Sequence, residues 1–91
     1  MSRVEIYTKR WCAFCQMAKS LLGRMGLAFE EYDVTSDPRR EQEMKERSGR
    51  HTVPQVFIDG RPVGGYAELS ELHATGRLAD PPAGGGAGEQ G

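Results

Sequence analysis

Two cysteines separated by two residues are the side chains of this sequence best suited to do chemistry. Cys12 and Cys15 are the only cysteines among its 91 residues. Three residues along a helix make nearly one turn, so the two sulfurs can approach closely enough to form a disulfide. At a helix start, unpaired backbone amides and the helix dipole favour the thiolate, which is the form that attacks a disulfide. The spacing therefore predicts a redox pair, with Cys12 as the nucleophile and Cys15 as the resolving thiol.

Two other uses of the cysteine pair stay open at this point. A structural zinc ion needs about four ligands, and the remaining candidates, His51 and His73, do not have zinc-finger spacing. The cysteines could also be buried without a role, although the polar loop before Cys12 argues against burial of that thiol. We expect no metal bound by the chain alone, and the redox interpretation is favoured.

The composition restricts the classes of function that need to be considered. Twelve Lys and Arg against thirteen Asp and Glu give a net charge of -1, so electrostatics gives no reason to expect nucleic acid or a membrane surface as a partner. No apolar run has the length of a membrane-spanning helix, and residues 1–6 alternate rather than forming a signal peptide. Two cysteines are also too few for a secreted disulfide scaffold, so we expect a cytoplasmic protein.

Apolar periodicity and turn residues place the cysteine pair between a first strand and a first helix. The elements we expect are a strand over 3–7, a helix over 13–25, a strand over 29–34, a helix over 39–48 that begins at 36–38, hairpin arms over 56–58 and 61–63, and a helix over 66–75. Residues 1–78 then form one domain. Residues 79–91 are rich in proline and glycine without an apolar period, which predicts a disordered tail.

This order of elements predicts an α/β fold. The succession β-α-β-α-β-β-α begins with a strand, a helix and a strand, which pair in parallel through a right-handed crossover. The hairpin, turning at Asp59 and Gly60, adds an antiparallel edge where Pro62 is tolerated. We therefore expect a four-stranded mixed sheet with helices on both faces.

Three motifs in this order resemble those of the glutaredoxin family, in particular its small bacterial dithiol members with a thioredoxin-like fold. Residues 4–9 lead into the cysteines as they do in that family, residues 47–58 resemble the segment with the family's cis-proline, and residues 64–66 resemble its glutathione-binding turn. The resemblance covers residues 3–78. Three motifs in register are far more specific than the cysteine pair alone.

The resemblance implies a glutathione-dependent thiol-disulfide oxidoreductase that reduces protein disulfides and glutathione mixed disulfides through Cys12 and Cys15. Glutathione would be the co-substrate, disulfide-bearing or glutathionylated proteins the partners, and the protein a monomer. A cis bond before Pro54 would expose the backbone of Val53 to an extended glutathione. The implied glutathione-binding residues are Lys9, Phe14, Thr52, Val53, Pro54, Gly65, Tyr66 and Ala67.

Some positions depart from the family pattern. Ala13 and Phe14 stand where the family usually has Pro and Tyr, and Ala67 stands where an Asp commonly contacts the γ-glutamyl end. Glu41 falls where a Gln or Arg often meets the glycine carboxylate, which it would repel. We therefore expect weaker binding of glutathione than is usual in the family. Two neighbours could take over from Glu41, namely Arg40 and Gln42.

Two alternative functions accompany this hypothesis. Ala13 lacks the restraint of a proline next to Cys12. In this family, replacing that proline can permit a [2Fe-2S] cluster held by Cys12 and glutathione across a dimer. A redoxin reduced directly by thioredoxin reductase is the other alternative. The turn at Gly64 and Gly65 favours glutathione over that reductase.

Overall fold

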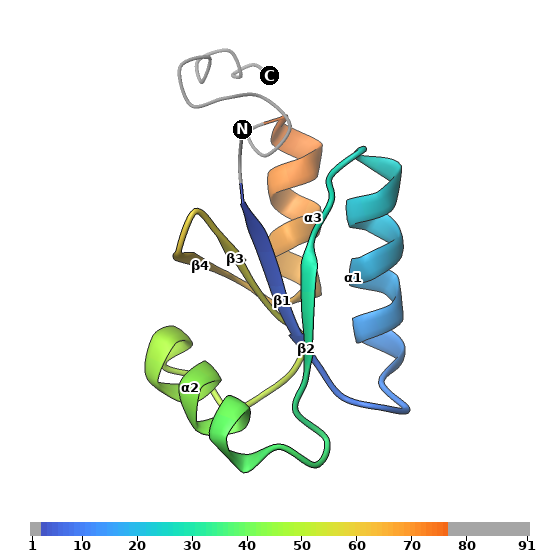
Figure 1. Cartoon of the computed structure of the whole chain (residues 1–91). Coiled ribbons are helices and arrows are strands. Elements are labelled where there is room, and N and C mark those ends of the chain that lie inside the picture. The colour runs from blue at the N-terminus through green and yellow to red at the C-terminus, as the bar shows by residue number, and fades with distance from the viewer. Residues whose placement is uncertain (1–2, 77–91) are drawn as a thin grey trace.

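The structure, a computed structural model that describes residues 3–76, is a mixed sheet with helices on both faces (Figure 1). The elements are β1 (Val4–Thr8), α1 (Ala13–Arg24), β2 (Glu30–Asp33), α2 (Pro38–Ser48), β3 (Gln55–Ile58), β4 (Arg61–Gly64) and α3 (Tyr66–Thr75). The predicted order β-α-β-α-β-β-α and the four-stranded mixed sheet are confirmed. The predicted tail over 79–91 lies outside the described residues.

The strand order β2-β1-β3-β4 puts β1 in the interior of the sheet. β1 pairs in parallel with β2 and antiparallel with β3, which itself pairs antiparallel with β4. All five residues of β1 are buried, as expected for a strand covered on both faces. The hairpin turn has positive φ at Asp59 and Gly60, 52° and 83°, which is the conformation that an Asp-Gly pair favours. β4, with Pro62, is an edge strand as predicted.

The two faces of the sheet have different cores. α1 and α3 cover one face with the aliphatic side chains of Leu21, Leu22 and Leu69, which pack on Ile6 and Val56. The other face is covered by α2 and has a smaller core, consisting of Tyr7, Val34, Met44 and Phe57. Figure 1 shows α2 standing apart from α1 and α3. Within residues 3–76, no helix is long and apolar enough to cross a membrane.

Element boundaries differ from the sequence expectation by a residue or so. β1 runs to Thr8 because that residue pairs with Asp33 of β2, and β3 begins at Gln55 because it pairs with Tyr7. Pairing with the neighbouring strand sets these ends, and the apolar pattern of a single segment contains no information about that pairing. The start of α2 follows the predicted signal, with Asp37 as the N-cap accepting from the Arg40 amide at 3.1 Å.

α2 is held to the sheet largely by a charged contact. Met44 is its only buried residue. The Arg47 guanidinium donates to both carboxylate oxygens of Glu5, at 3.0 and 3.3 Å, and to the Tyr7 hydroxyl at 2.8 Å. It also lies 4.1 Å from the ring centroid of Phe57. Glu5 is 5% exposed, and the hydrogen bonds from Arg47 keep the pKa of this carboxyl below its usual range.

We expect Glu5→Gln to lower the free energy of unfolding by about 1–3 kcal/mol at pH 7, because a buried charged hydrogen-bond partner is lost. An acid with a lowered folded pKa stabilises the fold above its unfolded pKa of about 4.3 and loses that contribution as the pH falls through the lowered value. The difference between wild type and variant should therefore narrow below about pH 4.3. Urea unfolding at pH 7 and at acid pH measures it.

A matched control for this substitution is Glu71→Gln on α3, because Glu71 is exposed. It should change stability by no more than about 0.5 kcal/mol. A Glu5→Gln protein as stable as this control at pH 7 would contradict the role given to the contact with Arg47.

Candidate active site

Cys12 is the N-cap residue of α1, and its sulfur closes the first turn of that helix. The Cys12 Sγ accepts a hydrogen bond from the backbone N–H of Cys15 at 3.1 Å. The side chain is half-buried and the thiol is free. Trp11, just before it, has φ 58° and is 97% exposed, so the chain enters the helix through a left-handed residue. The expected position of Cys12 at a helix start is thus what the structure has.

Cys15 lies one turn into α1 and is fully buried. Burial, together with a hydrogen bond to Cys12, raises the pKa of Cys15 to about 12. Cys15 therefore keeps its proton at neutral pH, while the Cys12 sulfur receives an amide N–H at the positive end of the helix. This geometry separates an accessible thiol whose sulfur receives a backbone N–H from a protected thiol beside it, as an attacking and resolving pair requires.

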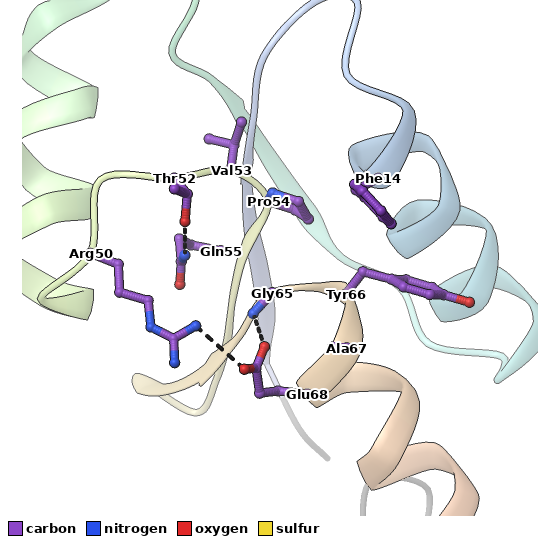
Figure 2. A pocket seen from close by; sticks show the side chains of 10 residues that line it. All are labelled: Phe14, Arg50, Thr52, Val53, Pro54, Gln55, Gly65, Tyr66, Ala67 and Glu68. Atoms are coloured by element: carbon purple, nitrogen blue, oxygen red, sulfur yellow. Dashed lines mark hydrogen bonds and ion pairs between the residues drawn. The ribbon is translucent and has the colours of Figure 1, made fainter.

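A pocket of about 260 Å³ lies beside this helix start (Figure 2). Its walls come from α1, from the loop that joins α2 to β3, and from the N-terminus of α3. Seven of the eight residues that the resemblance implies for glutathione line it, and they are Phe14, Thr52, Val53, Pro54, Gly65, Tyr66 and Ala67. The rings of Phe14 and Tyr66 face each other with centroids 6.2 Å apart. We call this pocket the groove.

Backbone shape in the groove depends on a cis-proline and two glycines. The bond between Val53 and Pro54 is cis, as the resemblance implies. The Pro54 carbonyl oxygen comes within 3.4 Å of where a Cβ on Gly65 would lie. Gly64 has φ 121°, and a Cβ there would meet the Glu68 side chain at 2.9 Å. A side chain at Gly64 would be strained by this φ and would displace the Glu68 carboxylate, whereas a Cβ on Gly65 would touch the Pro54 carbonyl oxygen.

Three further residues line the groove and were not expected from the sequence, namely Arg50, Gln55 and Glu68. The Glu68 Oε1 accepts from the Gly65 amide at 2.8 Å, and this hydrogen bond holds the pKa of Glu68 below its usual range. Its Oε2 lies 3.5 Å from Arg50 Nη1 (Figure 2). A glutamate three residues after an N-cap is the signal of a capping box, which could have identified Glu68.

Gln55 is the other unexpected residue with unusual surroundings. It is 1% exposed, and its Nε2 donates to Thr52 Oγ1 at 3.3 Å. Its Oε1 is buried without a hydrogen-bond donor among residues 3–76. Gln55 Oε1 is therefore an unsatisfied buried acceptor in the wall of the groove.

Lys9, the eighth expected residue, does not line the groove. It lies in the loop between β1 and α1, and its Nζ is 3.5 Å from Glu41 Oε2 on α2. Glu41 therefore faces a cation that the resemblance implies for glutathione binding.

The two residues expected to take over from Glu41 are engaged elsewhere. Arg40 donates to Glu43 at 2.8 Å, and its guanidinium lies 4.0 Å from the ring centroid of Tyr32. Gln42 donates to Glu46 at 3.1 Å along the helix surface. Glu43 and Tyr32 hold Arg40 in this structure and Glu46 holds Gln42, so a part for either side chain in binding glutathione stays a prediction.

A sheet of this topology, with a cysteine capping its first helix and a cis-proline loop beside it, defines the thioredoxin-like class of thiol-disulfide proteins. The family model described as Glutaredoxin matches residues 4–63, and the chain belongs to the glutaredoxin family. Glutaredoxin 3 of Escherichia coli is 47% identical over 81 residues, which span 89% of this chain and 96% of that protein. This membership makes the protein a glutathione-dependent disulfide oxidoreductase with the pair Cys12–Cys15.

Solved structures of the family agree with this assignment. The solution structure of glutaredoxin from Brucella melitensis is 46% identical, with a TM-score of 0.73 over 84% of this chain and 83% of that one. The crystal structure of the buckwheat glutaredoxin-glutathione complex is 28% identical, with a TM-score of 0.75 over 85% of this chain and 73% of that one. As for the zinc alternative, no three His, Cys, Asp or Glu side chains within residues 3–76 come together as a metal site.

We expect iodoacetamide to modify Cys12 in the native protein at pH 7 and to spare Cys15. A buried thiol with a pKa of about 12 has too little thiolate to react, so Cys15 should be at least about a hundredfold slower. Mass spectrometry of the labelled protein measures both sites, and denaturation should make Cys15 reactive. The matched variants are Cys15→Ser, which should label at the wild-type rate, and Cys12→Ser. If native Cys12→Ser labelled like a free thiol, the proposed division between the two thiols would be wrong.

Proposed function

We propose that Cys12 carries out every initial attack in this protein, on glutathione mixed disulfides and on protein disulfides alike, and that Cys15 resolves only the latter. The observation that carries the proposal is the unequal placement of the two thiols. Cys12 is accessible and its sulfur receives a backbone N–H, whereas Cys15 is fully buried with a raised pKa.

On a glutathionylated protein, the Cys12 thiolate attacks the glutathione sulfur and the protein leaves as a thiolate, which then takes a proton. A second glutathione thiolate attacks the glutathione sulfur now bonded to Cys12. Oxidised glutathione leaves and the Cys12 thiolate is restored. Cys15 has no part in this cycle.

On a protein disulfide, the Cys12 thiolate attacks one sulfur and the other leaves as a thiolate. Cys15 then attacks the Cys12 sulfur, the second substrate sulfur leaves as a thiolate, and the proton that Cys15 loses balances the one that this thiolate takes up, so the protein is released fully reduced. The resulting Cys12–Cys15 disulfide is reduced by two glutathiones, which leave as oxidised glutathione. The burial of Cys15 keeps it from attacking a substrate disulfide directly, so it acts only on the Cys12 mixed disulfide.

We further propose that the groove holds glutathione beside Cys12. The backbone of Val53 would pair with the extended tripeptide, and the amides of Tyr66 and Ala67 at the start of α3 would bind one carboxylate. Because the thiol lies between the two ends of glutathione, the other carboxylate would reach the opposite side of Cys12, toward Lys9. The lining of the groove, which includes Val53, Tyr66 and Ala67, and the buckwheat glutaredoxin-glutathione complex support this placement.

The partners we propose are disulfide-bearing and glutathionylated proteins, which the protein would meet as a monomer. We place it in the cytoplasm, because its cycle uses reduced glutathione and its cysteines must return to thiols after each turnover.

Carriage of a [2Fe-2S] cluster is the second candidate function. It rests on Ala13, an exposed residue at the first position of α1 that leaves its backbone N–H beside the accessible Cys12. Such clusters are held by cysteine thiolates, and Cys12 is the one accessible cysteine of the chain. A cluster would therefore need a second copy and two glutathione thiols. Anaerobic reconstitution with iron, sulfide and glutathione should yield a coloured dimer, and a colourless monomer with reduced Cys12 would exclude this function.

Single substitutions should separate the two cycles. We expect Cys12→Ser to lose all activity, because no thiolate remains at the helix start. Cys15→Ser should keep at least about half of the activity on a glutathionylated peptide and lose reduction of a protein disulfide, since external glutathione replaces Cys15 only in the first cycle. A coupled assay with glutathione and glutathione reductase measures both. Equal loss of activity on the glutathionylated peptide in the two variants would contradict the proposal.

A further inference from the structure

An ion pair formed within the chain lies where the proposed glutathione would present its glycine end. Lys9 Nζ and Glu41 Oε2 are 3.5 Å apart, and their side chains are 40% and 31% exposed. Lys9 precedes the cysteine-bearing helix, and Glu41 lies in the first turn of α2. The pair thus joins two segments that are far apart in the sequence, at the edge of the active site.

The neighbouring arginines do not compete with Lys9 for the Glu41 carboxylate, because they pair with other carboxylates. Arg10 lies 3.8 Å from Asp33, and Arg40 is held by Glu43. Lys9 is the only cation within 4 Å of the Glu41 carboxylate among residues 3–76. An ammonium that already faces a carboxylate attracts a second carboxylate less, and the first carboxylate repels the second.

We propose that Glu41 is a specificity-determining residue that cancels the preference of the active site for a free C-terminal carboxylate. The protein would then accept γ-glutamyl-cysteinyl thiols with a blocked, neutral carboxyl end as readily as glutathione itself. This inference rests on the proposed function, since it assumes that the thiol peptide lies in the groove with its carboxyl end toward Lys9.

The size of the effect follows from the exposure of the pair. Exposed ion pairs are worth up to about 1 kcal/mol, which corresponds to a factor of about five in binding. Removing the charge of Glu41 should therefore raise the second-order rate constant for a ligand with a free carboxylate by about three- to fivefold at low ionic strength. A ligand with a neutral amide in that place gains nothing. Salt at about 0.5 M should reduce the gain, because solvent-exposed charges are screened.

The test uses the full chain with Cys15→Ser, so that each protein performs a single transfer to Cys12. Two mixed disulfides of one peptide are compared, made either with glutathione or with its C-terminal glycinamide. The second-order rate constant for peptide release is measured for the parent, for Glu41→Gln and for Glu46→Gln. Glu46 is the matched control because it is an exposed carboxylate of the same helix that contacts Gln42 rather than Lys9. It changes the net charge by the same amount.

The parent should react with both mixed disulfides at rates within about twofold, and Glu41→Gln should react about three- to fivefold faster with the glutathione form only. Glu46→Gln should leave the ratio of the two rates unchanged. The inference is overturned if Glu41→Gln alters both rates by one factor, or neither, while the parent remains active. If the parent transfers neither thiol peptide to Cys12, the proposed function itself fails, and the inference with it.

Discussion

The contact between Arg47 and Glu5 determines where α2 lies, and the active site depends on that helix at both of its ends. α2 buries one side chain, Met44, so apolar packing alone fastens it weakly. The Arg47 guanidinium donates to the Glu5 carboxylate on β1 and lies over the ring of Phe57. From this position, the first turn of α2 places Glu41 at Lys9, and its end leads into the loop of Val53 and Pro54. The contact between Arg47 and Glu5 thereby supports the groove, although neither residue lines it.

Much of the fold could be predicted from the sequence, because each element has its own signals. Alternation marks β1, Asp37 and Pro38 begin α2, and an Asp-Gly pair forms the hairpin turn. The cysteine pair was predictable for the same reason, since helical spacing alone brings Cys15 under Cys12. Strand ends were less predictable, as they depend on the neighbouring strand.

The groove could be predicted only in part. Seven residues that line it were expected from the resemblance, but Arg50 and Gln55 were missed although they lie within residues 47–58, because their roles depend on what folding places opposite them. Glu41 could likewise be interpreted only in part from the sequence. Its charge was recognisable as unfavourable for a ligand carboxylate, but its partner Lys9 is 32 positions away along the chain. The two expected replacements, Arg40 and Gln42, contact other side chains in the structure.

The exposed indole of Trp11 gives this protein an optical reporter of its own chemistry. It is the single tryptophan of the sequence and adjoins Cys12, so all tryptophan emission arises one residue away from the attacking sulfur. With 97% of its surface in water, the ring has no packing of its own to report. A disulfide formed beside the indole, or a polypeptide laid across it, should therefore change its fluorescence, so that turnover can be followed without a label.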